Sequence, residues 1–196
     1  MSTTSAVKTR VSDKRDAILE ATLDLIAERG FHDTPMSMIA KESGVSAGII
    51  YHYFASKEEL IYDLYYEIKR DMFQKVMRGF SEQQPYRQRF LDLWLNFLRY
   101  YIDHPRETVF LEQFENSPYS QPDHLEDFAD EMNQIIRFYI QGVEAGILKD
   151  LPFQVSGELT FGVAVSLAKQ HINDTILLDD ELIQLTADAC WDAVSV

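Results

Sequence analysis

Apolar residues recur along the chain at intervals of three and four, the spacing of one face of an α-helix. The alternation typical of strands is absent, as are hairpin dipeptides such as Asn-Gly. Breaks at Gly, Pro and polar capping residues divide the chain into predicted helices 13–29, 36–43, 47–54, 57–79, 86–103, 106–116, 123–145, 154–172 and 180–194. The pattern therefore predicts an all-α protein in which three short helices precede a bundle of six.

Capping residues mark where several of these helices begin. The first helix is expected to start at residues 12–13, which are Ser and Asp. Thr34 is expected to cap the second helix, with Pro35 as its first residue. Ser56 and Glu59 form a capping box, in which the Ser side chain accepts from the Glu59 amide and the Glu side chain reaches back.

Residues 34–57 have the spacing of a helix-turn-helix, two helices that cross steeply over a short turn. Ala40 has to be small because the next helix crosses it. Gly44 is expected to end the second helix in the left-handed conformation, which costs a residue with a Cβ roughly 1 kcal/mol or more. Val45 then enters the core from the turn. The positions expected to bury against the first helix are Ile39, Ile50 and Phe54.

Inward-pointing Ile50 and Phe54 leave one face of the third helix outside. Its exposed positions are Ala47, Gly48, Tyr51 and His52, with Ile49 and Tyr53 on the flanks. Small residues at its start let such a helix enter a DNA major groove, which is about 12 Å wide. Ser46, Tyr51 and Lys57 offer donors to phosphates, and His52 offers a donor to a phosphate or a base edge. The alternative is a three-helix packing module that binds no DNA.

Residues 16–60 resemble the DNA-binding head of the TetR/AcrR family of bacterial transcriptional regulators. The residues that carry the resemblance are Gly30-Phe31, Ile39-Ala40, Gly44-Val45-Ser46, Gly48, Tyr51, Tyr53-Phe54 and Ser56-Lys57. The resemblance implies that 47–54 is a recognition helix. The residues implied to touch phosphates are Thr34, Ser46, Tyr51 and Lys57, and those implied to face the groove are Ala47, Gly48, Ile49, His52 and Tyr53. The sequence departs from the family at Pro35, where Thr is usual, and at the apolar Ala47 and Ile49, where some members have polar base-reading residues.

The charge is divided unevenly along the chain. Of 18 basic and 32 acidic residues, residues 1–57 hold seven of each, so the whole net charge of −14 falls in residues 58–196. Four basic residues form an N-terminal arm: Lys8, Arg10, Lys14 and Arg15. We expect a DNA-binding domain over 1–57 and a ligand-binding and dimerisation domain over 58–196, with the neutral head approaching a polyanion first. Acidity that serves only solubility is the alternative.

The last two predicted helices are amphipathic and rich in small residues, which favours close helix packing between two subunits. A twofold pairing through residues 155–194 would set the two recognition helices about 34–36 Å apart, which matches a palindromic operator. The residues expected at this homodimer interface are Leu159, Gly162, Val163, Ser166, Leu182, Leu185 and Ala189. An intramolecular core is the alternative for the same face.

The middle helices are rich in aromatic residues with a few interleaved polar groups, a composition typical of small-molecule sites between bundle helices. The residues expected to line an effector pocket are Trp94, Phe97, Tyr101, Phe110, Phe114, Phe138 and His171. The effector would be small and largely apolar or aromatic. An ordinary aromatic core explains the same spacing.

Other chemistry is not indicated. The sequence has no Gly-rich phosphate loop, metal-spaced His/Cys cluster or activated nucleophile, so we expect no enzyme, cofactor or metal. No apolar run approaches the roughly 18–20 residues of a membrane span, and no signal peptide is evident. Cys190, the one cysteine, is expected in the core. We expect a cytoplasmic, nucleoid-associated regulator. Three functions fit the sequence: a dimeric repressor released by a ligand, a regulator controlled by a partner protein or by no ligand, or an acidic helical module that no longer binds DNA.

Overall fold

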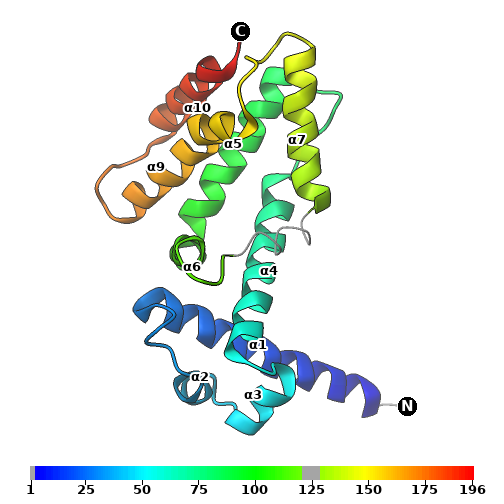
Figure 1. Cartoon of the computed structure of the whole chain (residues 1–196), viewed down its shortest axis with the longest axis vertical. Helices are drawn as coiled ribbons and strands as arrows, with labels where there is room; N and C mark the ends of the chain where they lie inside the picture. Colours follow the sequence, from blue (N-terminus) through cyan, green and yellow to red (C-terminus); the bar gives the residue numbers. More distant parts are fainter. Residues whose placement is uncertain (1–2, 121–128) are drawn as a thin grey trace. The chain divides into compact units, whose positions relative to one another are not determined.

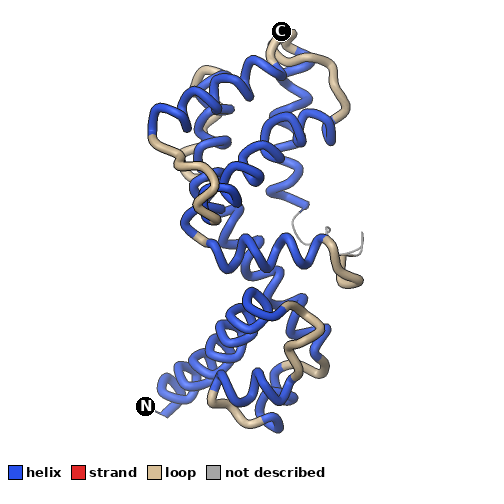
Figure 2. The backbone as a smooth tube through the Cα atoms, turned by 90° about the vertical axis from the view of Figure 1, so that its left-hand side faces the viewer, coloured by secondary structure: helices blue, strands red, loops and turns tan. Residues whose placement is uncertain are grey.

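A computed structural model of the protein describes residues 3–120 and 129–196 (Figure 1). Its helices are α1 (Thr3–Arg29), α2 (Met36–Ser43), α3 (Ala47–Tyr53), α4 (Lys57–Val76), α5 (Tyr86–Asp103), α6 (Pro105–Glu115), α7 (Ala129–Glu144), α8 (Phe153–Gly157), α9 (Val163–Ile172) and α10 (Asp180–Val194), with a π-helical turn, η2 (Glu158–Gly162), joining α8 to α9. The described residues form no strand, and Figure 2 shows helices joined by short loops. The predicted all-α class is confirmed.

Two helix boundaries differ from prediction. Helix α1 begins at Thr3 and not at residues 12–13, because no Gly or Pro in the preceding segment interrupts the helix. Helix α4 ends at Val76, ahead of the expected Gly79, which adopts a left-handed φ of 79° in the following turn. The start expected for α7, at residue 123, lies outside the described residues.

The chain packs into two compact units. The head unit comprises Met1–Ile68 and Arg106–Pro122, and the body unit comprises Lys69–Pro105 and Asp123–Val196. Helix α6 thus packs with the first helices, because Phe114 contacts rings of α4 and the Gln113 side chain donates to the Ile26 carbonyl of α1. The functional boundary expected at residue 57 remains a prediction.

The head unit is built on an apolar core between α1, α2 and α3. The core positions predicted from the sequence are all buried: Ile18, Ala21, Leu25, Ile26, Ile39, Val45, Ile50 and Phe54. An aromatic cluster extends this core, since Phe114 of α6 stacks on Tyr65 of α4 with ring centroids 4.1 Å apart. Arg106 joins α6 to α1 through an ion pair with Glu20 at 2.7 Å.

The body unit is organised around α5, which packs against α9, α10 and η2. Helices α8, η2 and α9 run continuously over the span 154–172 that was predicted as one helix. The structure differs from that prediction only in the π-helical turn η2 within this span. Within it, the Thr160 carbonyl accepts from the buried Trp94 indole at 3.1 Å, and the Thr160 hydroxyl lies 3.1 Å from that of Tyr139. The π turn therefore holds a polar network inside an apolar core.

Cys190 of α10 belongs to the same core, as expected. It is buried, and burial raises the pKa of its thiol to about 11. The group is therefore a neutral thiol near pH 7.

The left-handed corner at Gly44 gives a test of the head's folding. A Cβ at Gly44 or at Gly48 would meet no atom within 4 Å, but only Gly44 has a positive φ, of 67°. Gly44→Ala should therefore lower the free energy of unfolding by about 1–2 kcal/mol through backbone strain alone. Gly48→Ala, in the helix α3, should leave it unchanged or raise it by up to about 1 kcal/mol. Urea denaturation measures both, and equal losses would contradict the role given to the Gly44 backbone.

Candidate DNA-binding surface and pockets

Helix α3 is fixed to the head by its buried side and presents the opposite side outward. Ile50 and Phe54 are fully buried, and the extended backbone at Ser46 begins the helix, its carbonyl accepting from Ile50 at 3.0 Å. The positions predicted to face outward are exposed, namely Ser46, Ala47, Gly48, Tyr51 and His52, and the predicted flanks Ile49 and Tyr53 are half-buried. The geometry of the expected recognition face is therefore present.

The side chains of this face are small at the start of the helix and polar one turn later. Ala47 and Gly48 add almost no bulk, and nothing lies within 4 Å of a Cβ built on Gly48. One turn later, Tyr51 is 54% exposed, and its neighbour His52 contacts the Tyr53 ring edge-on at 5.9 Å. The Ser46 side chain caps none of the helix amides. A slim helix start with hydroxyl and imidazole donors beside it suits entry into a wide groove.

Thr34 does not fit the role implied for it. It is fully buried, and its hydroxyl donates to the Gly30 carbonyl at 2.8 Å. The N-cap of α2 is Pro35, whose carbonyl accepts from the Met38 amide at 2.9 Å. Thr34 thus closes the turn after α1, and we correct the expectation that it caps α2 and touches a phosphate.

Lys57 has a structural contact that the sequence does not predict. It begins α4 and is half-buried, and its ammonium donates to the Phe31 carbonyl. Burial lowers the pKa of the Lys57 ammonium, while the neighbouring Glu58 carboxylate acts to raise it. An ammonium has three donors, so this contact leaves others for a phosphate.

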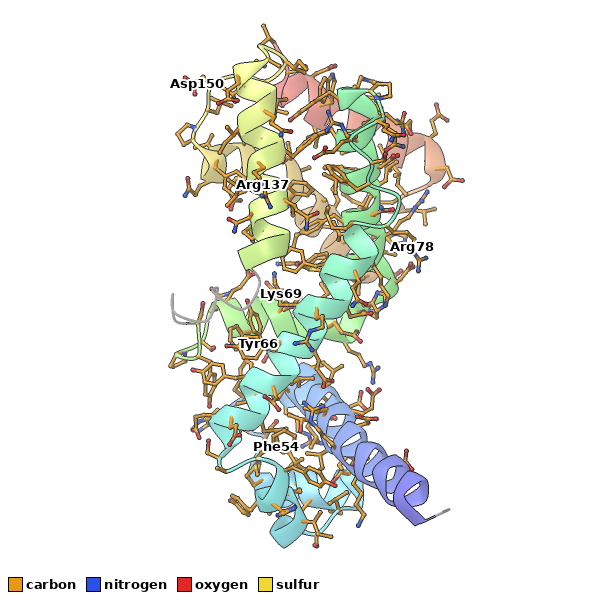
Figure 3. The ribbon with its side chains drawn as sticks, turned by 90° about the vertical axis from the view of Figure 1, so that its right-hand side faces the viewer. Phe54, Tyr66, Lys69, Arg78, Arg137 and Asp150 are labelled. Atoms are coloured by element: carbon orange, nitrogen blue, oxygen red, sulfur yellow. The ribbon has the colours of Figure 1, made fainter. Side chains whose placement is uncertain are left out.

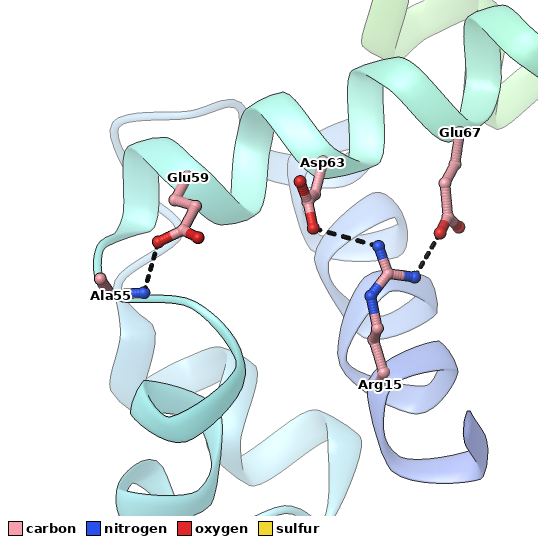
Figure 4. Close-up of polar contacts among 5 residues, drawn as sticks. All are labelled: Arg15, Ala55, Glu59, Asp63 and Glu67. Carbon is pink, nitrogen blue, oxygen red and sulfur yellow. Dashed lines mark hydrogen bonds and ion pairs between the residues drawn. The ribbon is translucent and has the colours of Figure 1, made fainter. Parts of the chain in front are cut away.

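The capping box at the start of α4 is present in a slightly different form. Ser56 Oγ accepts from the Glu59 amide at 3.1 Å, as predicted. The Glu59 carboxylate reaches back to the amide of Ala55 at 2.6 Å, one residue before the expected partner (Figure 4). Both bonds fix the connection between α3 and α4.

Arg15 holds α1 against α4 and is not part of a free basic arm. Its guanidinium bonds to Asp63 at 3.0 Å and also to Glu67, one turn further along α4 (Figure 4). The spacing of four between these carboxylates was the signal in the sequence, but only the fold shows which cation they face. Lys14 is exposed, and the side chains of Lys8 and Arg10 lie outside the described residues.

The aromatic residues predicted to line one pocket do not gather in one. Phe110 and Phe114 lie in the head unit and pack around Phe31, 5.6 Å and 6.4 Å from its ring. The other five lie in the body unit. Trp94, Tyr101 and Phe138 fill the core there, and His171 lies in the last turn of α9, where its Nδ1 accepts from the Leu178 amide at 3.3 Å. The aromatic-core alternative accounts for most of this set.

Phe97 does line an apolar pocket. The pocket, of about 190 Å³, lies in the body unit and is bounded by Lys69, Met72, Phe73, Val76, Phe97, Met132, Ile135, Phe153 and Phe161. Figure 3 labels Lys69, whose ammonium lies 5.1 Å from the Phe73 ring centroid. The missed residues Met72, Phe73 and Val76 continue the apolar stripe of α4, and that spacing was the available signal.

The predicted dimer face lies on the surface of the described body unit. Leu159, Ser166, Leu182, Leu185 and Ala189 are exposed, and Gly162 and Val163 are half-buried. Leu185 is 65% exposed, while the inward residues Ala164 and Ala168 are fully buried. The intramolecular core is therefore formed by other residues of the same helices, and the predicted face stays exposed among the described residues.

None of the helices described is long and apolar enough to cross a membrane. No cluster of His, Cys, Asp and Glu in this part of the chain has the arrangement of a metal site.

A helix-turn-helix with an exposed second helix defines the class of DNA-binding regulators, and comparison with known proteins agrees. Residues 18–64 match the family model described as bacterial regulatory proteins, tetR family, and residues 85–195 match that of the tetracyclin repressor-like C-terminal domain. The chain belongs to the TetR family of transcriptional regulators, proteins that bind DNA and are not enzymes.

Individual relatives cover nearly the whole chain. An uncharacterised HTH-type transcriptional regulator of Haemophilus influenzae is 26% identical over 188 residues, 93% of this chain and 96% of its own. The fatty acid metabolism regulator protein of Bacillus subtilis is 28% identical over 160 residues, 81% of this chain and 77% of its own. The crystal structure of a TetR family transcription regulator from Marinobacter aquaeolei superposes with a TM-score of 0.90 at 26% identity, covering 96% and 98% of the two chains.

Proposed function

We propose that this TetR-family regulator is a dimeric repressor that binds a palindromic operator and is released by a small, largely apolar ligand. The exposed face of α3, anchored by Ile50 and Phe54, is the observation that carries the DNA-binding part. A regulator of this kind works in the cytoplasm, at the nucleoid.

The contacts follow from the geometry of α3 and its flanks. Ser46, Tyr51 and Lys57 would bind phosphates, which fix the position of the helix on the duplex. Ala47, Gly48, Ile49, His52 and Tyr53 would face the bases. Because Ala47 and Ile49 are apolar, specificity would rest on thymine methyl groups and DNA shape. Thr34, which is buried, is left out of this set.

A substitution of Lys57 tests whether this residue contacts DNA or serves only the structure of the head. Lys57→Gln should weaken binding to DNA that flanks the protein's own gene, and the slope of log K against log salt should become shallower by about 0.9 for each lost phosphate contact. Lys149 provides the control, because its ammonium also donates to backbone carbonyls, of Asp192 and Ala193, but lies in the body unit. Fluorescence anisotropy over a range of salt measures both variants. A slope unchanged by Lys57→Gln would leave only the structural contact with Phe31.

Dimerisation is supported by the exposed apolar face of η2, α9 and α10 in the described body unit. Leu159, Val163, Leu182 and Leu185 place branched apolar side chains on neighbouring turns, while Gly162 and Ser166 permit close approach of a second helix. An isologous pairing would bury this face and repeat the recognition helix at the spacing of one DNA turn.

A charge placed on this face should separate the subunits. Leu185→Lys should convert a dimer to a monomer, because two lysines would be buried against the twofold axis without counter-charges. The matched control is Leu177→Lys, in the loop before α10, where the leucine is 81% exposed and outside the predicted face. Light scattering during size exclusion measures the mass. A dimer in both variants would place the interface elsewhere.

The apolar pocket supports control by a ligand. Eight of its nine lining residues are apolar, and Lys69 is the single cation. This composition suits a hydrocarbon chain that ends in an acidic group, and one relative is named a regulator of fatty acid metabolism. A volume of about 190 Å³ is below the usual range for such pockets, so the pocket would have to widen around the ligand.

Filling the pocket should abolish the response. Met132→Trp should weaken binding of decanoate at least about tenfold, because the indole would occupy the space of the chain. Ile140→Trp is the control, since Ile140 is exposed on the same helix and outside this pocket. Calorimetry gives the affinity, and release of the operator fragment gives the response. If decanoate neither binds the unaltered protein nor releases DNA, control by a partner protein or by no ligand becomes the better alternative.

A further inference from the structure

A second pocket in the body unit differs in chemistry from the apolar one. Its volume is about 290 Å³, and its lining combines two arginines, two glutamines and two phenylalanines with one carboxylate: Phe80, Glu82, Arg89, Gln134, Arg137, Phe138 and Gln141. It shares no lining residue with the apolar pocket. Helices α9 and α10, the expected dimer face, contribute nothing to it.

Arg89 is held in place by aromatic rings. The rings of Tyr86 and Phe138 stack with centroids 4.2 Å apart, and the Arg89 guanidinium lies 4.9 Å from the first centroid and 5.5 Å from the second. Gly142 of α7 permits this arrangement, because a Cβ there would lie 2.3 Å from the Tyr86 hydroxyl. Arg89 is thus fixed at the pocket before any ligand arrives.

Neither arginine of the pocket forms an ion pair with a described residue, although the Glu82 carboxylate belongs to the same lining. The chain has 32 acidic and 18 basic residues, and Arg15, Arg87 and Arg106 are all in ion pairs. Arg89 and Arg137 are in none, and Arg89 Nε is buried without a hydrogen-bond partner. Arg137 uses only its Nε, which donates to the Asn133 carbonyl at 3.2 Å. A half-buried guanidinium such as that of Arg89, which forms no ion pair and has an unbonded Nε, favours an anion from outside.

We propose that this pocket is a second small-molecule site, which binds a compact carboxylate or phosphate monoester with a flat apolar part. Arg89 and Arg137 would bind the oxyanion, for which the planar guanidinium fork is suited. Gln134 and Gln141 would supply neutral donors and acceptors, and Phe80 and Phe138 would cover the apolar part. Figure 3 labels Arg137 on α7. Glu82 would oppose the anion and limit its affinity.

Calorimetry on the full-length protein tests the site with three probes of similar size: benzoate, phenyl phosphate and neutral benzyl alcohol. At least one anion should bind about tenfold more tightly than the alcohol, and the tighter of the two identifies the acidic group. Equal binding of all three probes, or binding of none, would overturn the proposal.

Variants with opposite expected effects separate binding from a structural role. Arg137→Gln should weaken the anion about tenfold, whereas Glu82→Gln should strengthen it several-fold because a repelling charge is lost. Arg87→Gln is the control, since Arg87 lies two residues before Arg89 but pairs with Asp188 outside the pocket. Arg89→Gln should also weaken the anion, and circular dichroism checks its fold; Arg137 and Glu82 are exposed, so their variants test the site even if this one unfolds.

An equal loss in Arg87→Gln, or no change in Arg137→Gln and Glu82→Gln, would contradict the site. The measurement uses no DNA and no fatty acid. A negative result therefore leaves the proposed repressor function standing, and a failure of that function leaves this site standing.

Discussion

The orientation of α3 depends on one corner of the backbone. Gly44 turns the chain with a positive φ, and Val45 directly after it is buried in the head core. The turn and the buried Ile50 together fix which side of α3 points inward, and every exposed position of the helix follows from that choice. Because a seven-residue helix has little stability of its own, its face is set by these tertiary contacts and by the helices that it crosses.

Polar contacts then fix α4 to the same core. Arg15 bonds two carboxylates one turn apart on α4, and Lys57 and Ser56 fix the first turn of that helix. Each pair is partly exposed, so each contributes little alone. Their effect is geometric, because they hold the first turns of α4 in place on the head core. The basic side chains of Arg15 and Lys57 are thus partly engaged in holding the head unit together.

Much of the fold could be predicted because helical periodicity and caps are local. The exposed face of α3, the buried face of α1 and the cap at Ser56 all follow from spacing and residue type. The exceptions needed information about distant residues. Thr34 is of a residue type that often caps helices, but its hydroxyl donates to the carbonyl of Gly30, four residues earlier. Aromatic spacing likewise could not separate a core from a pocket, since Trp94 is fully buried whereas Phe97, three residues later on the same helix, lines a pocket.

Helix α7 shows why the body unit has two pockets of different chemistry. Met132 and Ile135 lie on the apolar pocket, whereas Gln134, Arg137 and Gln141 repeat at intervals of three and four on the other. One amphipathic helix therefore supplies an apolar wall and a polar wall at the same time. Phe138 lies within the polar series, and it is there that the stack with Tyr86 holds Arg89. A polar face that served only solvation would not need a buried ring in its middle. It also would not hold a half-buried arginine that forms no ion pair among the described residues of a chain with 32 acidic residues.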